Sequence, residues 1–331
     1  MNNYKVLIVG LGSMGCRRIR LLQAFFGSCT LAATDLSAER RRQASEQFGI
    51  PIYSDIDNAL QAFSPDVGFV CTSPLSHSGI IKTLLEGGMH VFTEINLVDD
   101  GYEQNNSLAA SSKLTLFLSS TQIYRREIQY IEDRLKEAGT VAYRYHVGQY
   151  LPDWHPWESY REFFVSDRRT GGCVELLAIE FPWLERAFGT IRELKVNSLR
   201  LSTLELDYND TIFLTLSHEG GSIGQLLVDL VSRKATRSLE ILSENLYISW
   251  NGKPNSLRDY DIAGKKDRKV DAYQTVLQDI RYADNIVENA YVDEMTAFFD
   301  TLEGRKARRH SFSDDARLLD IIHNVCNYNG R

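Results

Sequence analysis

The first 120 residues alternate short apolar runs with longer amphipathic stretches, which predicts strands and helices in turn. The run "YKVLIVG" at 4–10 reads as a buried strand, and "SMGCRRIRLLQAF" after it as the helix that it leads into. Alternation with apolar strands is typical of a parallel sheet covered by helices on both faces. Gly49 fits the C-cap of the second helix and Asp55 the N-cap of the third. Further strands are expected at 30–35, 50–54, 66–73, 90–94 and 113–120, and further helices at 37–49, 55–63, 77–86 and 101–111.

The pattern changes at about residue 122, where an amphipathic helix at 126–139 is followed by longer strand-like runs. Several of these runs alternate apolar and polar residues, as a sheet with one solvated face does. The turn "SHEGGS" at 217–222 reads as a hairpin loop between two of them. The sequence therefore predicts an α/β protein: a doubly wound parallel domain at 1–121 and an α+β domain with a mostly antiparallel open sheet at 122–331. The later strands are expected at 140–149, 191–202, 210–218, 222–231 and 238–250, and the last helices at about 287–303 and 314–328.

The segment "VGLGSMG" follows the first strand and opens the first helix, with its glycines in the G-x-G-x-x-G spacing. Gly10 permits a tight turn, Gly12 lets a diphosphate approach the backbone, and Gly15 lets the helix pack closely on the strand. Unpaired amides and the helix dipole favour the diphosphate at this end, where Ser13 and Met14 would border it. The segment predicts a dinucleotide-binding Rossmann domain. The alternative is a glycine turn in an α/β protein that binds no dinucleotide.

Asp35 ends the second strand, twenty residues after Gly15, where an acid that binds the adenosine ribose belongs. Its carboxylate would accept from the ribose hydroxyls and repel an additional phosphate, so NAD is expected rather than NADP. The run Arg40, Arg41 and Arg42 weakens this preference. Consecutive helical residues point to different faces, however, so a solvated surface is the simpler interpretation of the run.

The bulk composition is that of a globular protein, with 43% hydrophobic and 24% charged residues. The net charge of -7 argues against nucleic acid and anionic membrane surfaces as partners. The sequence shows neither an apolar run of about 18 residues, which a membrane span requires, nor a signal-peptide pattern, so a cytoplasmic protein is expected. Its five cysteines lack a C-x-x-C pair and its seven histidines lack ligand spacing, so no metal is expected.

With the glycine motif, the segments "CTSPLSHSGIIKTLLEGGMHVFTE", "RRTGGCVELL" and "YVDEMTAFFDTLEGR" resemble the Gfo/Idh/MocA oxidoreductases, the glucose–fructose oxidoreductase and inositol dehydrogenase group. The resemblance covers nearly the whole chain and implies an NAD(P)-dependent oxidoreductase that forms homo-oligomers through its open sheet. "LPDWHPWESY" at 151–160 resembles a sugar-modifying branch from pathways for sialic-acid-like sugars. By resemblance, a loop beneath the nicotinamide half of the cofactor holds Thr72, Ser73, Pro74 and His77, and Glu94 completes the cofactor-binding set.

The resemblance breaks at the positions that handle protons in this family. The usual Glu-Lys-Pro motif is replaced by Glu94-Ile95-Asn96, so the lysine is missing. The later helix, "GGCVELLAIEFPWLERAFG", contains no histidine, and the family's Asp and His fall within 177–183. Pro182 in the same stretch is expected to disturb the helix.

Three residues are candidates to replace the lost catalytic groups. Glu180 can act as a base if burial raises its pKa, or it is an ordinary carboxylate on a helix surface. His155 lies between two tryptophans in a loop that can reach a cleft, or it is structural. Tyr124 can line the substrate pocket, although packing is the commoner role of a tyrosine. Asp153 can bind a sugar hydroxyl or cap its turn.

These observations leave three hypotheses open. The first is an NAD-dependent oxidoreductase with an atypical proton relay, acting on a sugar, sugar acid or nucleotide sugar. The second is a catalytically impaired pseudoenzyme that binds a dinucleotide or sugar as a sensor or partner subunit. The third is redox chemistry that needs no proton from the enzyme, such as reduction of a conjugated system.

Overall fold

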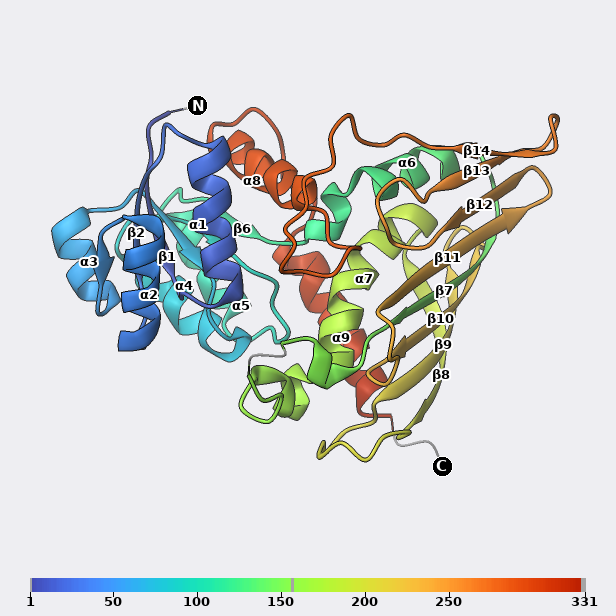
Figure 1. Cartoon of the computed structure of the whole chain (residues 1–331), viewed down its shortest axis with the longest axis horizontal. Helices are drawn as coiled ribbons and strands as arrows, with labels where there is room; N and C mark the ends of the chain where they lie inside the picture. The colour runs from blue at the N-terminus through green and yellow to red at the C-terminus, as the bar shows by residue number, and fades with distance from the viewer. Residues whose placement is uncertain (1, 156–157, 329–331) are drawn as a thin grey trace. The chain divides into compact units, whose positions relative to one another are not determined.

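The computed structural model describes residues 2–155 and 158–328 of the chain (Figure 1). The chain forms two compact units. The first unit comprises Met1–Ser120 and Val292–Ala316, and the second comprises Thr121–Tyr291 and Arg317–Arg331. The sequence predicted a single boundary after residue 121, whereas a C-terminal segment returns to the first unit. The functions predicted for the two domains stay predictions.

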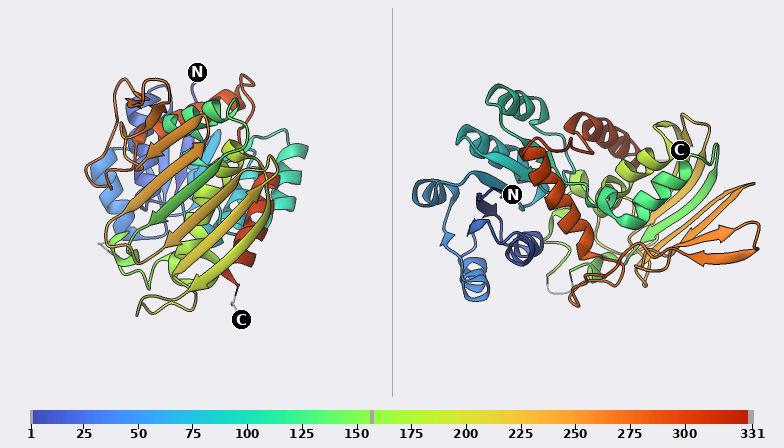
Figure 2. Two further views of the ribbon diagram at one scale, coloured as in Figure 1. Left: turned by 90° about the vertical axis from the view of Figure 1, so that its right-hand side faces the viewer. Right: turned by 90° about the horizontal axis from the view of Figure 1, so that it is seen from above.

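The first unit contains a six-stranded parallel sheet with the order β3-β2-β1-β4-β5-β6, as the alternating pattern predicted. Helices lie on both sides of this sheet (Figure 2). The predicted caps are confirmed: Gly49 is left-handed (φ 64°) after the second helix, and Asp55 accepts from the amide of Asn58. The strands are β1 (Lys5–Val9), β2 (Thr30–Thr34), β3 (Ile52–Tyr53), β4 (Val67–Val70), β5 (His90–Thr93) and β6 (Leu116–Leu118), and the helices are α1 (Ser13–Phe25), α2 (Ala38–Phe48), α3 (Ile56–Phe63), α4 (His77–Glu86) and α5 (Tyr102–Ser111).

An aromatic cluster explains why the C-terminal segment belongs to the first unit. Phe69, Phe92 and Phe117 lie on the neighbouring strands β4, β5 and β6 and stack across the sheet. Phe298 of helix α8 (Glu288–Leu302) meets all three rings edge-on, with centroid distances of 5.5 to 5.6 Å. All four rings are almost fully buried. Burial of such rings is the largest apolar contribution that single residues make.

The second unit contains an eight-stranded sheet with the order β14-β13-β12-β11-β7-β10-β9-β8, antiparallel except for the β7–β10 pair. The predicted hairpin at 217–222 is confirmed, because it joins β9 to antiparallel β10. Residues 238–250, expected as a single strand, form the two strands of a hairpin. The strands are β7 (Ala142–Gly148), β8 (Ile191–Leu199), β9 (Thr211–His218), β10 (Ile223–Asp229), β11 (Thr236–Ser243), β12 (Leu246–Trp250), β13 (Arg258–Asp261) and β14 (Lys266–Lys269).

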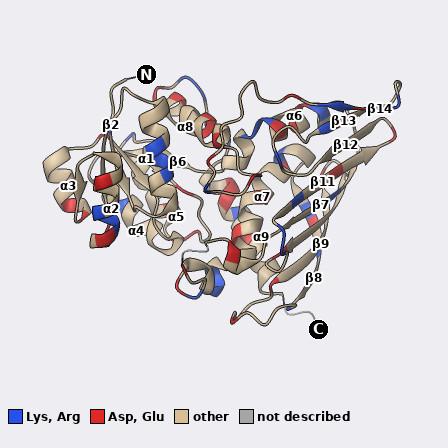
Figure 3. Cartoon of the chain, in the orientation of Figure 1, with Lys and Arg blue, Asp and Glu red and all other residues tan. Residues whose placement is uncertain are grey.

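The hairpin of β13 and β14 was not predicted. Its strand residues "RDYD" and "KDRK" are mostly charged and carry no apolar alternation. β14 is exposed along its whole length, and its lysine and arginine residues colour much of this edge of the sheet blue in Figure 3. Charged residues on an edge strand discourage pairing with another chain, which accounts for a strand of this composition.

Helix α7 (Gly172–Phe188) follows three short turns: η3 (Leu151–Asp153), η4 (Phe164–Ser166) and η5 (Arg168–Thr170). Two glycines allow the start of this helix to pack closely against Tyr208 and Leu230. A Cβ at Gly171 would lie 2.8 Å from the Tyr208 ring, and one at Gly172 would lie 2.8 Å from Leu230. The expected disturbance at Pro182 is wrong, because the helix continues through it to Phe188 and the proline is buried. Burial of this apolar helix outweighs the single backbone hydrogen bond that proline removes.

The remaining helices are α6 (Arg126–Leu135), next to the short turn η2 (Thr121–Tyr124), and α9 (Phe312–Cys326). Within the described part of the chain, every helix is too short or too polar to span a bilayer.

Candidate functional site

The glycine turn has the geometry that its sequence predicted. Gly10 adopts φ +99°, and a Cβ there would lie 2.7 Å from the carbonyl oxygen of Cys71. A Cβ at Gly15 would lie 1.8 Å from the carbonyl oxygen of Gly10, so the helix and the turn touch. Gly12 is the N-cap of α1, and a Cβ there would meet no described atom within 4 Å. Ser13 and Met14 begin the helix beside this open space. A diphosphate can therefore approach the α1 amides, and the residues present fit a dinucleotide.

Asp35 stands beside this turn, directly after β2. Its Oδ2 accepts from the amide of Leu11 at 2.7 Å, and its Oδ1 accepts from the amide of Ser37 at 2.7 Å. Each carboxylate oxygen keeps a further lone pair for a ligand hydroxyl. The carboxylate thus links the glycine turn to the start of α2. In dinucleotide-binding domains, an acid at this position binds the adenosine ribose next to the diphosphate.

The arginine run after Asp35 is largely committed to other partners. Arg41 donates to the carbonyl oxygens of residues 35 and 36, and Arg42 pairs with Glu39 and Glu46. Arg40 approaches the Asp35 carboxylate at 4.0 Å, with its side chain half exposed. Arg40 is thus the arginine of this run whose guanidinium group lies near the Asp35 carboxylate.

The loop after β4 contains Thr72 and Ser73, followed by η1 (Pro74–Ser76) and then α4. His77 opens α4 but is buried and faces inward. Its Nδ1 lies 2.5 Å from Asn96 Oδ1, and its Nε2 lies 3.0 Å from the carbonyl oxygen of Thr72. Burial lowers the pKa of His77, although both acceptors oppose that shift. His77 therefore anchors the loop from its buried side, while Ser73 is exposed on the outer side of the loop.

Asn96, at the position of the missing proline, extends this contact into a buried polar chain. Its side chain also hydrogen-bonds the Tyr102 hydroxyl, which in turn donates to Asp315 Oδ2 at 2.5 Å. Asp315 Oδ1 lies 3.1 Å from His310 Nε2. The Asn96 side chain therefore has structural partners in His77 and Tyr102, while the loss of a family motif at this position stays a prediction.

Glu94 is held inside the first unit. Its carboxylate accepts from Arg18 of α1 at 2.6 and 3.1 Å. Arg18 also donates to Glu294 of α8 at 2.8 Å and lies over the ring of Phe92. Glu294 further accepts from the Ser119 hydroxyl and the amide of residue 120. Both carboxylate oxygens of Glu94 accept hydrogen bonds from Arg18 in this buried ion-pair network. These contacts give Glu94 a structural role, and its contact with a cofactor stays a prediction.

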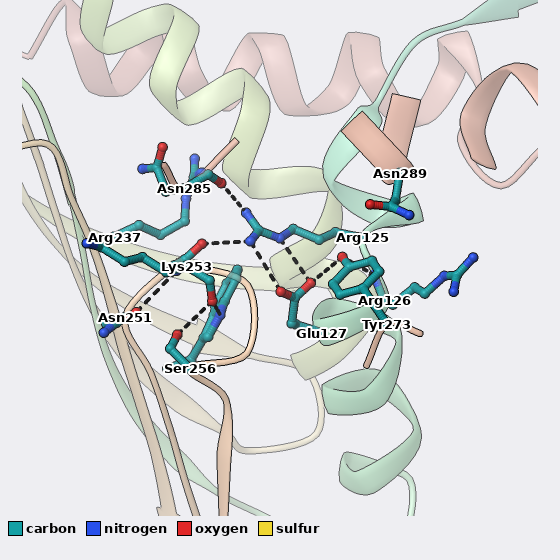
Figure 4. Close-up of polar contacts among 12 residues, drawn as sticks. Arg125, Arg126, Glu127, Arg237, Asn251, Lys253, Ser256, Tyr273, Asn285 and Asn289 are labelled. Atoms are coloured by element: carbon teal, nitrogen blue, oxygen red, sulfur yellow. Dashed lines mark hydrogen bonds and ion pairs between the residues drawn. The ribbon is translucent and has the colours of Figure 1, made fainter. Parts of the chain in front are cut away.

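Tyr124 is buried at the end of η2. The next residue in the chain, Arg125, is the centre of a polar network (Figure 4). The Arg125 guanidinium pairs with Glu127 and donates to the carbonyl oxygens of residues 252 and 285. It also lies over the Trp250 ring, 4.7 Å from its centroid. Tyr273 donates to Glu127 Oε2 at 2.5 Å. The network fixes the segment around Tyr124, whereas contact of Tyr124 with a substrate stays a prediction.

Glu180 is fully buried on α7, so the alternative of a surface carboxylate does not hold. Its Oε2 accepts from the Tyr145 hydroxyl at 2.7 Å and from the Trp183 indole at 2.6 Å. Its Oε1 pairs with Arg237 of β11. Three donors, one of them cationic, therefore surround this carboxylate. Its role as a base stays a prediction, and its contacts describe a link between α7 and the sheet.

His155 lies after η3, with its Nδ1 2.7 Å from Glu158 Oε1 and its ring 4.3 Å from that of Phe163. Asp153 ends η3, where its backbone amide donates to Tyr150. The two residues after His155 lie outside the described part of the chain. The structure thus gives His155 a carboxylate partner, and its catalytic role stays a prediction.

One carboxyl that sequence reasoning missed is Glu175, in the first turn of α7. Its Oε2 is buried and has no hydrogen-bond partner among the described residues. Burial raises its pKa to about 7. An acid in the first turn normally complements the helix dipole, so no local pattern in the sequence indicates this environment. The described residues also contain no cluster of side chains able to hold a metal.

Comparison with known proteins agrees with this geometry. Residues 4–113 match the model of the oxidoreductase family with the NAD-binding Rossmann fold, GFO_IDH_MocA. YceM of Salmonella typhimurium, named as an oxidoreductase, is 27% identical over 144 residues, which are 43% of this chain and 46% of that protein. The match therefore spans about half the length of that curated relative.

Solved structures share the fold of the whole chain at low sequence identity. UDP-N-acetylglucosamine 3-dehydrogenase GnnA from Acidithiobacillus ferrooxidans is 16% identical with a TM-score of 0.76, covering 98% of this chain and 97% of its own. Biliverdin reductase from Synechocystis, solved with biliverdin and NADP+, is 17% identical with a TM-score of 0.72, covering 99% of this chain and 100% of its own. Residues 4–113 thus resemble the NAD-binding Rossmann domain of the GFO_IDH_MocA oxidoreductases, and the two sheets share the fold of these solved structures.

Proposed function

We propose that this protein is an oxidoreductase that uses NAD, in preference to NADP, to interconvert an alcohol and a carbonyl on a sugar, sugar acid or nucleotide sugar. The observation that carries the proposal is the open approach to the α1 N-terminus at Gly12, beside the Asp35 carboxylate. Arg41 and Arg42 are committed elsewhere, which supports the choice of NAD. GnnA supports the substrate class, because its name gives a UDP-linked sugar as substrate.

The chain's residues have separable tasks in this function. The α1 amides bind the diphosphate, Asp35 orients the adenosine ribose, and His77 holds the Thr72–Pro74 loop from below. When bound, NAD takes up hydride from the carbon that is oxidised. The chain must also provide a group that takes the hydroxyl proton, and proton transfer of this kind contributes typically 10²–10⁴ in rate. Ile95 cannot do this, so the group lies elsewhere.

The first experiment is a titration with NADH and separately with NADPH, followed by nicotinamide fluorescence. Gly12→Leu should lower NADH affinity at least roughly 100-fold, because its side chain fills the diphosphate approach. Gly27→Leu is the matched control, since a Cβ at Gly27 also meets no described atom within 4 Å but lies beyond the far end of α1. Equal NADH affinity of the two variants would refute the binding site.

Turnover distinguishes the enzyme from a pseudoenzyme. The protein, with NAD, is assayed for NADH formation against a panel of sugars, sugar acids and nucleotide sugars that includes UDP-N-acetylglucosamine. Turnover that Gly12→Leu abolishes supports the oxidoreductase. Tight NADH binding without turnover of any member supports the sensor or partner-subunit hypothesis, which the loss of the lysine and histidine positions favours.

We further propose that the protein is a homo-oligomer that works in the cytoplasm. Figure 2 shows the outer face of the eight-stranded sheet without helices over it. On that face Ile223, Ala142 and Leu242 form a row across three neighbouring strands, and Phe213 is 46% exposed. All five cysteines are free, as in proteins of reducing compartments. Light scattering on the intact protein and on Phe213→Glu tests the oligomer, which the substitution should dissociate.

A further inference from the structure

The loop at 230–235, which joins β10 to β11 in the second unit, carries two basic side chains without an acidic partner. Arg233 and Lys234 are both exposed. Among the described residues, neither forms an ion pair, and the Arg233 guanidinium donates no hydrogen bond. Arg237, at the start of β11, pairs instead with the buried Glu180. The two cations of the loop are therefore accessible to a ligand.

The Arg233 guanidinium is held in place by an aromatic ring. Its central carbon lies 3.6 Å from the centroid of the Tyr150 ring. Stacking on a ring leaves the N–H groups at the edge of the guanidinium able to donate. An arginine that is already oriented loses less side-chain entropy when it binds. The contact therefore prepares the N–H fork of Arg233 for a carboxylate or a phosphate, both of which it binds with two parallel hydrogen bonds.

Backbone contacts fix the loop beside this ring. The amide of Tyr150 donates to the carbonyl oxygen of Ser232 at 2.7 Å. The carboxylate of Asp229, the last residue of β10, accepts from the amides of residues 231 and 232 and from the Ser232 hydroxyl. The residues before Arg233 are thus held by the end of β10 on one side and by the segment around Tyr150 on the other.

A partly accessible tryptophan lies near the same loop. The Trp154 indole donates to the carbonyl oxygen of Gln149 at 3.1 Å. The amide of Gln149 in turn donates to the carbonyl oxygen of Asp229 at 3.2 Å. Aromatic rings combined with a few placed polar groups are typical of small-molecule sites, and the C–H face of a sugar ring packs on an aromatic face. The two cations and the indole fit a ligand that joins an anionic group to a sugar.

We propose that Arg233 and Lys234 form an anion-binding subsite, contained in the second unit, for the charged group of a sugar ligand. The oxyanion accepts from the guanidinium edge of Arg233, and the ammonium group of Lys234 supplies a second positive charge. The carboxylate of a sugar acid and the diphosphate of a nucleotide sugar share this chemistry. The inference deepens the proposed function, on which the choice of a sugar rests, and it disfavours neutral sugars.

Calorimetric titration of the full-length protein tests the subsite without turnover. The probes are glucuronate and UDP-N-acetylglucosamine, with glucose and N-acetylglucosamine as neutral counterparts, each titrated with and without NAD+. Arg233→Met keeps an unbranched side chain on the Tyr150 ring and removes the charge. It should weaken binding of an anionic probe roughly 10- to 100-fold, as expected for a charge-assisted hydrogen bond. Arg233→Lys, which keeps the charge without the planar fork, should recover part of the affinity.

Arg192→Met is the matched control. Arg192 is exposed on β8, at the other end of the sheet order from β14, and it forms no ion pair among the described residues. An effect of Arg233→Met on glucuronate alone identifies a sugar acid, and an effect on UDP-N-acetylglucosamine alone identifies a nucleotide sugar. Equal affinities of the two methionine variants for both probes overturn the proposal. Absence of binding of either probe to the unchanged protein overturns it as well.

Titration with NADH separates this inference from the proposed function. Arg233→Met should bind NADH as the unchanged protein does. If the unchanged protein fails to bind NADH, the proposed function fails, whereas an affinity for an anionic probe that depends on Arg233 still supports the subsite. Turnover of a neutral sugar, with equal probe affinities in Arg233→Met and Arg192→Met, retains the proposed function and overturns the subsite.

Discussion

Replacing Glu175 with glutamine should stabilise the protein at alkaline pH relative to acidic pH. The pKa of this carboxyl is raised by burial, so between pH 4.5 and about 7 the folded state binds more protons than the unfolded state. Stability then falls as pH rises through that window, because folding holds an unpaired carboxylate away from water. Glutamine has nearly the same shape and never ionises, so the variant avoids this penalty.

The magnitude follows from the difference between the two pKa values. A rise from 4.5 to about 7 costs the folded state up to about 3 kcal/mol once the group is ionised. Glu175 is partly accessible, and solvent screening reduces this value to about 1–3 kcal/mol. The effect of Glu175→Gln on the free energy of unfolding should therefore be more favourable by about 1–3 kcal/mol at pH 8 than at pH 5. Comparing the two pH values cancels any constant effect of the new amide.

Urea unfolding followed by tryptophan fluorescence is a suitable assay. The four tryptophans lie between residues 154 and 250, so their emission reports on the second unit, which contains α7. Glu180→Gln is the matched control, five residues along the same helix. It should destabilise the unit by about 3–5 kcal/mol at pH 8, because it leaves the buried Arg237 without its counter-charge.

Two results would refute this reasoning. The first is an effect of Glu175→Gln that is the same at pH 5 and pH 8, which would mean that the carboxyl is ionised at both. The second is a loss of stability at pH 8 comparable to that of Glu180→Gln, which would mean that Glu175 has a cationic partner.

Three further substitutions test other parts of the structure. Asp35→Asn should raise NADPH affinity relative to NADH about tenfold, measured by fluorescence titration, because a charge near the ribose is worth about 1–2 kcal/mol; an unchanged ratio would contradict the placement of the ribose. Arg18→Met should cost about 3–5 kcal/mol in urea unfolding, since two buried carboxylates lose their cation. Phe298→Ala should cost about 3–5 kcal/mol by the same assay, and a cost below 1 kcal/mol would mean that the aromatic cluster does not hold α8.

The sequence predicted those parts of the fold that hydrophobic periodicity encodes. The six parallel strands, the caps at Gly49 and Asp55 and the hairpin at 217–222 follow from local patterns. The β13–β14 hairpin was missed because its strands are mostly charged and show no alternation of apolar and polar residues. The two strands pair through backbone hydrogen bonds, which do not depend on side-chain type. The hairpin within 238–250 was missed for a related reason, since its two-residue turn interrupts an otherwise continuous run.

The candidate site was predictable where backbone geometry determines it and not where side-chain partners do. The glycine turn follows from steric limits that act on one residue at a time. The burial of Arg18 and the pairing of Glu94 depend on Glu294, two hundred residues further along the chain. The difference between Glu175 and Glu180 likewise depends on whether a distant strand supplies an arginine.

The buried contact between His77 and Asn96 bears on which residues positions 95 and 96 can accept. Exchanging Ile95 and Asn96 for lysine and proline would restore an amine, but it would also remove the partner of His77 Nδ1 and the hydrogen bond to Tyr102. Thr93 Oγ1, 3.3 Å from the same nitrogen, would have to take over. Positions 77 and 96 are thus coupled, and lysine and proline would enter a structure whose buried contacts are made by Asn96. Such an exchange requires a compensating change near residue 77 to keep the loop after β4 in place.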